Sequence, residues 1–83
     1  MAEYPGLKQG HVVHSVEQDG ALVYLEDGAC FKVYSGFHPV SSLWQPEHMI
    51  IVKANPKNTE HPYKLINIHK NEQIEVSWIE DSE

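Results

Sequence analysis

The sequence predicts an all-β protein, a small SH3-like barrel of five to six antiparallel strands. Strand-like segments recur along the chain with turn signals between them, and no segment sustains the periodicity of a helix. The 83 residues suffice for one small domain, so we expect a single domain over 1–83. An OB-like barrel and two packed sheets are the alternative architectures that the same pattern allows.

The first half of the chain predicts a three-stranded antiparallel meander. Its expected strands are 11–17, 21–26 and 29–34. The pairs Asp19-Gly20 and Asp27-Gly28 separate these strands, and both fit two-residue type I′ loops, because Asp and Gly tolerate the positive φ that this turn requires. Alternation within the strands places Val23 and Leu25 on one face of their strand, and Phe31 and Val33 on one face of theirs. Phe31 and Trp78 alternate with polar neighbours and are expected in the core.

A loop of about ten residues, 36–46, interrupts the strands. Ser42 and Gln45 have the spacing of a capping box, which predicts one helical turn starting at Ser42. Pro46 opposes a longer helix, since a proline inside a helix lacks the backbone N–H and its ring clashes with the preceding turn.

The second half predicts three further strands, 49–53, 63–69 and 73–79. The continuous apolar run 49–53 predicts a strand buried on both sides, whereas 73–79 alternates cleanly between apolar and polar residues. We expect the ordered core to span about 10–79. The segments 1–8 and 80–83 are predicted to be frayed, because nothing in their sequence ties them down.

Charge and composition exclude several classes of function. The net charge is −6, and the basic residues are six lysines with no arginine, which argues against nucleic-acid binding. No apolar run is long enough to cross a bilayer, and the N-terminus lacks the pattern of a secretory signal. The single cysteine, Cys30, fits a reducing compartment, so we expect a cytoplasmic protein without membrane contact.

Four motifs in order resemble a group of small uncharacterised bacterial all-β proteins. The motifs are Asp19-Gly20, LEDGACFKV (25–33), SLWQP (42–46) and Leu65-Ile66-Asn67. The resemblance spans 12–79 and implies an all-β domain of bacterial type, with no particular activity. This chain departs from the group's pattern at Phe31, where tryptophan is expected, and at Tyr34-Ser35, where Asp-Pro is expected.

The sequence predicts neither catalytic residues nor a metal or other cofactor. It has no nucleophile-elbow or phosphate-cradling motif, and its turn glycines are explained by the hairpins. His11 and His14 are expected to point to opposite faces of one strand, so they do not form a ligand pair. The full set of histidines is His11, His14, His38, His48, His61 and His69. A site formed by loop histidines stays open as an alternative.

Aromatic residues in and beside the long loop are the candidate ligand-binding residues. Tyr34, Phe37 and Trp44 cluster there in the sequence, and long loops in compact domains often carry function. The alternative for Trp44 is that it folds back with Leu43 and plugs the end of the barrel. The carboxylates Glu26, Asp27, Glu72 and Glu75 are expected on a solvated acidic face.

These observations favour a non-enzymatic interaction module that binds a protein segment and allows a homo-oligomer. A barrel that binds single-stranded nucleic acid by aromatic stacking is the alternative, and a histidine metal site is a third hypothesis. The sequence identifies neither the partner nor the pathway.

Overall fold

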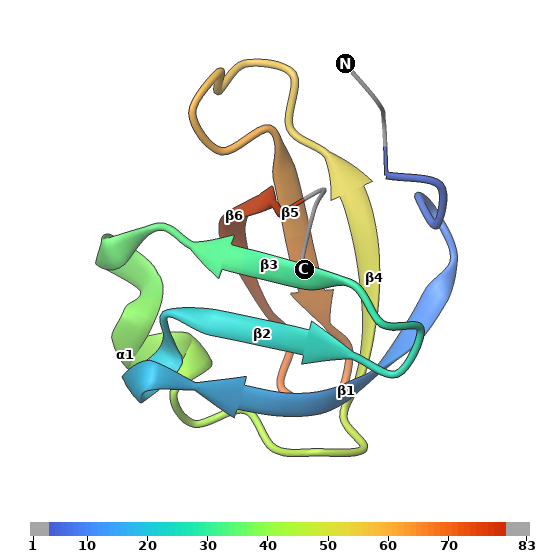
Figure 1. Ribbon diagram of the computed structural model, residues 1–83, viewed down its shortest axis with the longest axis vertical. Helices are drawn as coiled ribbons and strands as arrows, with labels where there is room; N and C mark the ends of the chain where they lie inside the picture. Colours follow the sequence, from blue (N-terminus) through green and yellow to red (C-terminus); the bar gives the residue numbers. More distant parts are fainter. Residues whose placement is uncertain (1–3, 80–83) are drawn as a thin grey trace.

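The structure is a computed structural model that describes residues 4–79 (Figure 1). Its elements are β1 (Gly10–Glu17), η1 (Gln18–Gly20), β2 (Leu22–Leu25), β3 (Cys30–Val33), η2 (Ser35–Phe37), α1 (His38–Ser41), β4 (Met49–Ala54), β5 (Tyr63–Asn67) and β6 (Glu72–Trp78). The predicted all-β class is therefore confirmed.

The six strands form one closed antiparallel barrel with the order β1-β2-β3-β6-β5-β4. Two successive meanders, β1-β2-β3 and β4-β5-β6, are joined along both sides by the pairs β1–β4 and β3–β6. The first three strands form the meander that the Asp-Gly turns predict. Because the barrel closes, each described strand is hydrogen-bonded to a neighbour on both sides.

Alternating side chains from the strands fill the barrel. The fully buried apolar residues are Val13, Val23, Phe31, Ile50, Val52, Leu65, Ile74 and Val76. The prediction that β4 is buried on both sides is wrong, because Met49 is 42% exposed and Ile51 is only half-buried. In a closed barrel only the inward face of a strand meets the core, whatever the hydrophobicity of its outward residues.

Both Asp-Gly hairpins form, but neither has the predicted two-residue loop. Strand pairing stops at Glu17↔Leu22, and the intervening loop carries three consecutive residues with positive φ, which end at Gly20. In the second hairpin the Leu25 N–H donates to the Ala29 carbonyl over 2.9 Å, which leaves a three-residue loop. Gly28 closes that loop with φ +93°, the conformation that a three-residue hairpin needs at its last position.

The helical turn lies earlier in the loop than the capping box predicts. η2 and α1 occupy 35–41, and Ser42 follows the helix instead of starting it. The Ser42 N–H donates to the His38 carbonyl over 2.9 Å. Pro39 lies in the first turn of α1, where a missing N–H costs nothing, so proline sets the start of this helix.

Residues 4–8 are packed on the barrel, so the prediction of fraying is wrong for them. Tyr4 is 3% exposed, and its N–H donates to the Tyr63 hydroxyl over 2.9 Å. The Lys8 N–H donates to the Val52 carbonyl over 2.7 Å. The predicted fraying of 1–3 and 80–83 concerns segments outside the described residues. Within the described part of the chain, no helix is long and apolar enough to cross a membrane.

Candidate functional site: an aromatic cluster at one end of the barrel

The structure brings two of the three predicted site residues together. Tyr34 follows β3 directly and Phe37 ends η2, and their rings meet edge to face with centroids 6.0 Å apart. Tyr34 is 44% exposed, whereas Phe37 is half-buried and packs against the core. A third ring joins them, because the His61 imidazole lies 4.8 Å from the Tyr34 ring at an angle of 47°. We call Tyr34, Phe37 and His61 the aromatic cluster.

Trp44 does not belong to this exposed cluster. Its side chain is 3% exposed and packs into the core, so the expectation that Trp44 offers an exposed face is wrong. The indole Nε1–H donates to Glu72 Oε1 over 2.9 Å, at the first residue of β6. This hydrogen bond satisfies the one polar atom of the indole while the ring packs into the core. Trp44 therefore has the plugging role that the sequence left as the alternative, but Leu43, which was expected to fold back with it, is 63% exposed.

The loop that carries His61 is held by asparagine side chains. Asn58 Oδ1 accepts the backbone N–H groups of Glu60 and His61, over 3.0 and 2.9 Å. Asn55 is buried, and its side-chain amide donates to the His61 carbonyl over 3.0 Å. His61 was not predicted as a site residue from the sequence. Asparagines spaced through the loop between two strands were the available signal, because such side chains commonly cap turns.

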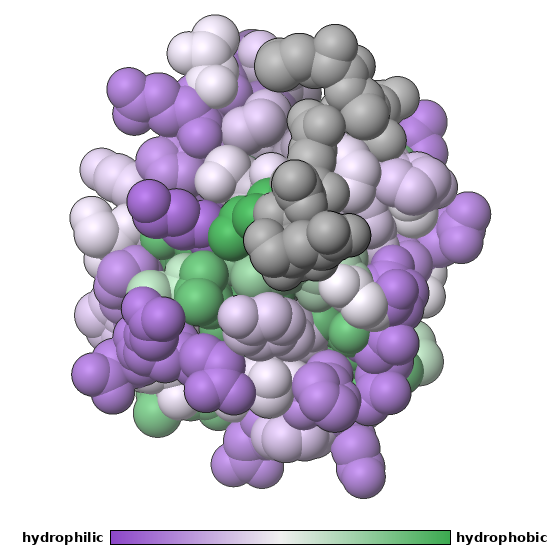
Figure 2. Space-filling view, viewed as in Figure 1, coloured by the Kyte–Doolittle hydropathy of each residue, from purple (hydrophilic) through white to green (hydrophobic). Residues whose placement is uncertain are grey.

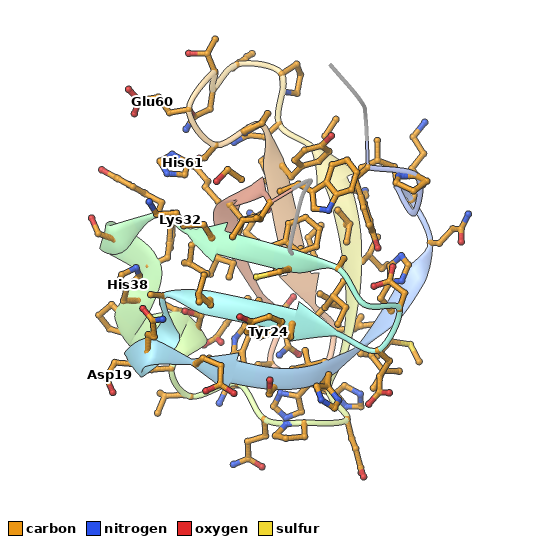
Figure 3. All side chains as sticks on the ribbon, viewed as in Figure 1. Asp19, Tyr24, Lys32, His38, Glu60 and His61 are labelled. Atoms are coloured by element: carbon orange, nitrogen blue, oxygen red, sulfur yellow. The ribbon has the colours of Figure 1, made fainter. Side chains whose placement is uncertain are left out.

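The aromatic cluster therefore joins two segments that are far apart in the chain, the turn after β3 and the loop before β5. Figure 3 labels His61 and Glu60 on the loop before β5 and Lys32 on β3. In Figure 2, hydrophobic side chains show between hydrophilic ones near the middle of the view, over β2 and β3. Rings fixed in this way can pack against proline rings, aliphatic side chains or cations.

The Cys30 thiol is not activated as a nucleophile. Burial raises the pKa of the Cys30 thiol, although a hydrogen bond with Tyr24 opposes that rise, so the reactive thiolate is disfavoured. Among residues 4–79, no group of three or more His, Cys, Asp or Glu side chains could hold a metal ion. His48 and His69 stack with centroids 5.4 Å apart, but they have no third ligand in this part of the chain.

A separate arrangement of polar side chains lies near Trp78, the last residue of β6. The Tyr4 hydroxyl donates to Asp27 Oδ2, and His11 Nδ1 lies 3.5 Å from the same oxygen. Burial, together with the hydrogen bond and the charge of Asp27, raises the pKa of Tyr4. This arrangement was not predicted from the sequence, because Tyr4 was expected in a frayed segment and Asp27 in a turn.

This second arrangement borders a pocket of about 220 Å³. The pocket lies between residues 4–5, the β2–β3 turn and the end of β6. Its lining residues are Tyr4, Pro5, Asp27, Gly28, Ala29, Trp78 and Ile79. Trp78, which the sequence predicts as core, is half-buried and forms part of the wall.

Comparisons of the chain with protein-family models, with curated proteins and with solved structures found no match.

Proposed function

We propose that the protein is a non-enzymatic, cytoplasmic interaction module on a small SH3-like barrel, which binds a segment of another protein. The observation that carries this proposal is the exposed Tyr34 ring, fixed between Phe37 and His61. Aromatic side chains with few rotatable bonds offer a large contact area at low entropic cost. Such residues are frequent anchors of protein interfaces.

The closed barrel limits the mode of binding. Each described strand is already paired on both sides, so an added peptide strand finds no free edge in this part of the chain. Recognition therefore depends on side chains. The hydrogen bonds from Asn55 and Asn58 hold the backbone around His61 before any partner binds, which reduces the entropy lost on binding.

The charge of the chain favours a basic or neutral partner. The net charge of −6 repels acidic segments and nucleic-acid backbones, and it accelerates encounter with a basic segment at low salt. Binding to single-stranded nucleic acid and assembly with a second copy are the two alternatives, and the experiments below test each of them separately.

A selection experiment with matched variants tests this function. Wild type, Tyr34→Ala and Ile68→Ala are immobilised and used to select peptides from a random display library and proteins from a lysate. Ile68 is 51% exposed and follows β5, so its substitution removes a comparable exposed apolar side chain without touching the aromatic cluster. We expect ligands that wild type and Ile68→Ala retain and that Tyr34→Ala binds at least tenfold more weakly.

Two measurements make the result decisive. Amide NMR spectra show whether each variant is folded, and shift mapping with the selected peptide shows whether Tyr34, Phe37 and His61 are perturbed. Equal binding by folded Tyr34→Ala, or shifts only at other surfaces, would contradict the assignment. Titration with a short single-stranded oligonucleotide at low salt, and sedimentation of the protein alone, test the nucleic-acid alternative and self-association.

A further inference from the structure

We propose that the pocket formed by Tyr4, Asp27 and Trp78 binds an alkylammonium group. This chemistry is shared by the side chain of lysine and by small free amines. The site is separate from the aromatic cluster, so it stands or fails independently of the function proposed above. Three properties of the pocket support the assignment: a negative wall, an aromatic wall and a suitable size.

The negative wall is the Asp27 carboxylate. Its Oδ1 accepts the Ala29 N–H over 2.9 Å, and its Oδ2 accepts the Tyr4 hydroxyl, so the group is held in place from both oxygens. Its side chain remains 36% exposed. Among residues 4–79, no lysine lies within ionic distance of the Asp27 carboxylate charge, and the one basic side chain beside it is His11, whose Nδ1 lies 3.5 Å from Oδ2. A cation entering the pocket would compensate that charge.

The aromatic wall consists of Trp78 and Tyr4. Their ring centroids lie 5.4 Å apart at an angle of 65°. An ammonium group is attracted to the face of an aromatic ring, most strongly to tryptophan, and its methylenes pack against the same surface. The Tyr4 ring is itself fixed against Phe31, with centroids 5.2 Å apart, so the core holds the wall rigidly.

The pocket has the size that this ligand needs. Its volume of about 220 Å³ corresponds to roughly seven water-sized groups, which accommodates four methylenes and an ammonium. Pro5, Ala29 and Ile79 supply apolar lining for the methylenes. An anion would face the Asp27 charge, and a neutral ligand would leave it unpaired, so the cation is the class that the wall favours.

Titration of the wild-type protein with n-butylammonium chloride tests the proposal directly. The titration is followed by amide NMR at pH 8, where an ordinary carboxylate and the ammonium group of an alkylamine are both charged. We expect saturable shifts, with a Kd on the order of a millimolar, at the amides of Asp27, Gly28 and Ala29 and at the Trp78 indole N–H. The neutral probe n-pentanol, of comparable length, should bind at least tenfold more weakly.

Two matched carboxamide variants separate a local charge from the overall charge. Asp27→Asn should weaken butylammonium binding at least tenfold. Glu26→Gln removes the same charge one residue earlier, from a side chain that lies 3.6 Å from His14 and does not line the pocket, so its affinity should stay within twofold of wild type. If Asp27→Asn does not fold, the wild-type shift map and the comparison with n-pentanol decide the question.

Several outcomes would overturn the assignment. These are the absence of saturable shifts at the pocket, equal binding of n-pentanol, or equal weakening by both variants. A capped Gly-Lys-Gly peptide distinguishes the sources of the ligand. Tighter binding of the peptide than of butylammonium identifies a lysine side chain of a protein, whereas the reverse identifies a free amine.

Discussion

At the scale of single residues, one buried amide organises the turn that leads from β5 to β6. Asn67 is fully buried, and its Oδ1 accepts the N–H groups of His69 and Lys70 over 2.9 and 3.1 Å. Its Nδ2 lies 3.0 Å from His48 Nδ1. The asparagine of the Leu65-Ile66-Asn67 motif therefore has a structural role, because it satisfies backbone groups that strand pairing leaves free.

Substitution of Asn67 should be costly in proportion to the hydrogen bonds lost. Asn67→Ala leaves two backbone N–H groups without their acceptor, and we expect a loss of about 2–4 kcal/mol in the free energy of unfolding. Asn67→Asp keeps the acceptor oxygen and should lose less. Urea denaturation of the three proteins measures the difference, and equal stability of Asn67→Ala and wild type would refute this role.

At the scale of elements, the short helix is docked on the first hairpin through a glycine. The Ser41 hydroxyl, fully buried, donates to the Gly20 carbonyl over 2.6 Å. A Cβ at Gly20 would lie 2.8 Å from the Ser42 nitrogen and would clash with the His38 carbonyl oxygen. Only glycine combines this close approach with the positive φ of +97°.

The two hairpin glycines should therefore differ in their response to alanine. Gly20→Ala combines backbone strain with the clash against α1, and we expect a loss of about 3 kcal/mol or more in the free energy of unfolding. Gly28 also has positive φ, at +93°, but a Cβ there meets no atom within 4 Å, so Gly28→Ala should cost only about 1–2 kcal/mol. Denaturant titrations measure both, and equal losses would show that contact with α1 does not matter.

The same elements show how far the sequence could predict the structure. Alternation of apolar and polar residues predicted the strands, the shared face of Val23 and Leu25, and the core position of Phe31, because this pattern depends on local geometry alone. Loop lengths and the start of α1 could not be predicted in this way. Gly20 is shaped by its contact with α1, about twenty residues later in the chain, and no local signal records that contact.

The candidate site was predicted in part for a related reason. Tyr34 and Phe37 are close in the sequence, so their proximity followed from the position of the loop. His61 joins them only through the pairing of β3 with β6 and of β6 with β5. The sequence left Trp44 open between the surface and the interior, because its partner Glu72, which accepts the indole N–H, lies far along the chain.

At the scale of the whole molecule, aromatic side chains fill both ends of the barrel. Trp44 is hydrogen-bonded to Glu72, the first residue of β6, and Tyr4 packs on Trp78, the last residue of the same strand. Residues 4–8, which precede β1, are thus part of the domain. The chain completes its core with a residue that precedes the first strand.

The buried Tyr4 should make stability fall at alkaline pH. Folding favours the neutral phenol, because the pKa of Tyr4 is raised above its usual value of 10.0 in the folded state. This contribution is fully present below pH 10 and is lost as the pH rises through the folded pKa, at up to about 1.4 kcal/mol per pH unit. Tyr4→Phe should be less stable than wild type at pH 7 and should show a shallower decline above pH 10.

Denaturation curves at pH 7 to 11 for both proteins provide the comparison. The lysines and Cys30 also titrate in this range, but they are common to both chains, so the difference between the two slopes isolates Tyr4. Parallel slopes would contradict the assignment of this group.

The joining of two meanders along both sides also governs how the chain folds. The hairpins within each meander need only short loops, whereas Gly10 must meet Ile51, and Phe31 must meet Trp78, across much of the chain. Closing such long loops costs conformational entropy before the new contacts repay it. The high contact order implies folding in milliseconds to seconds, with closure of the barrel as the slow step.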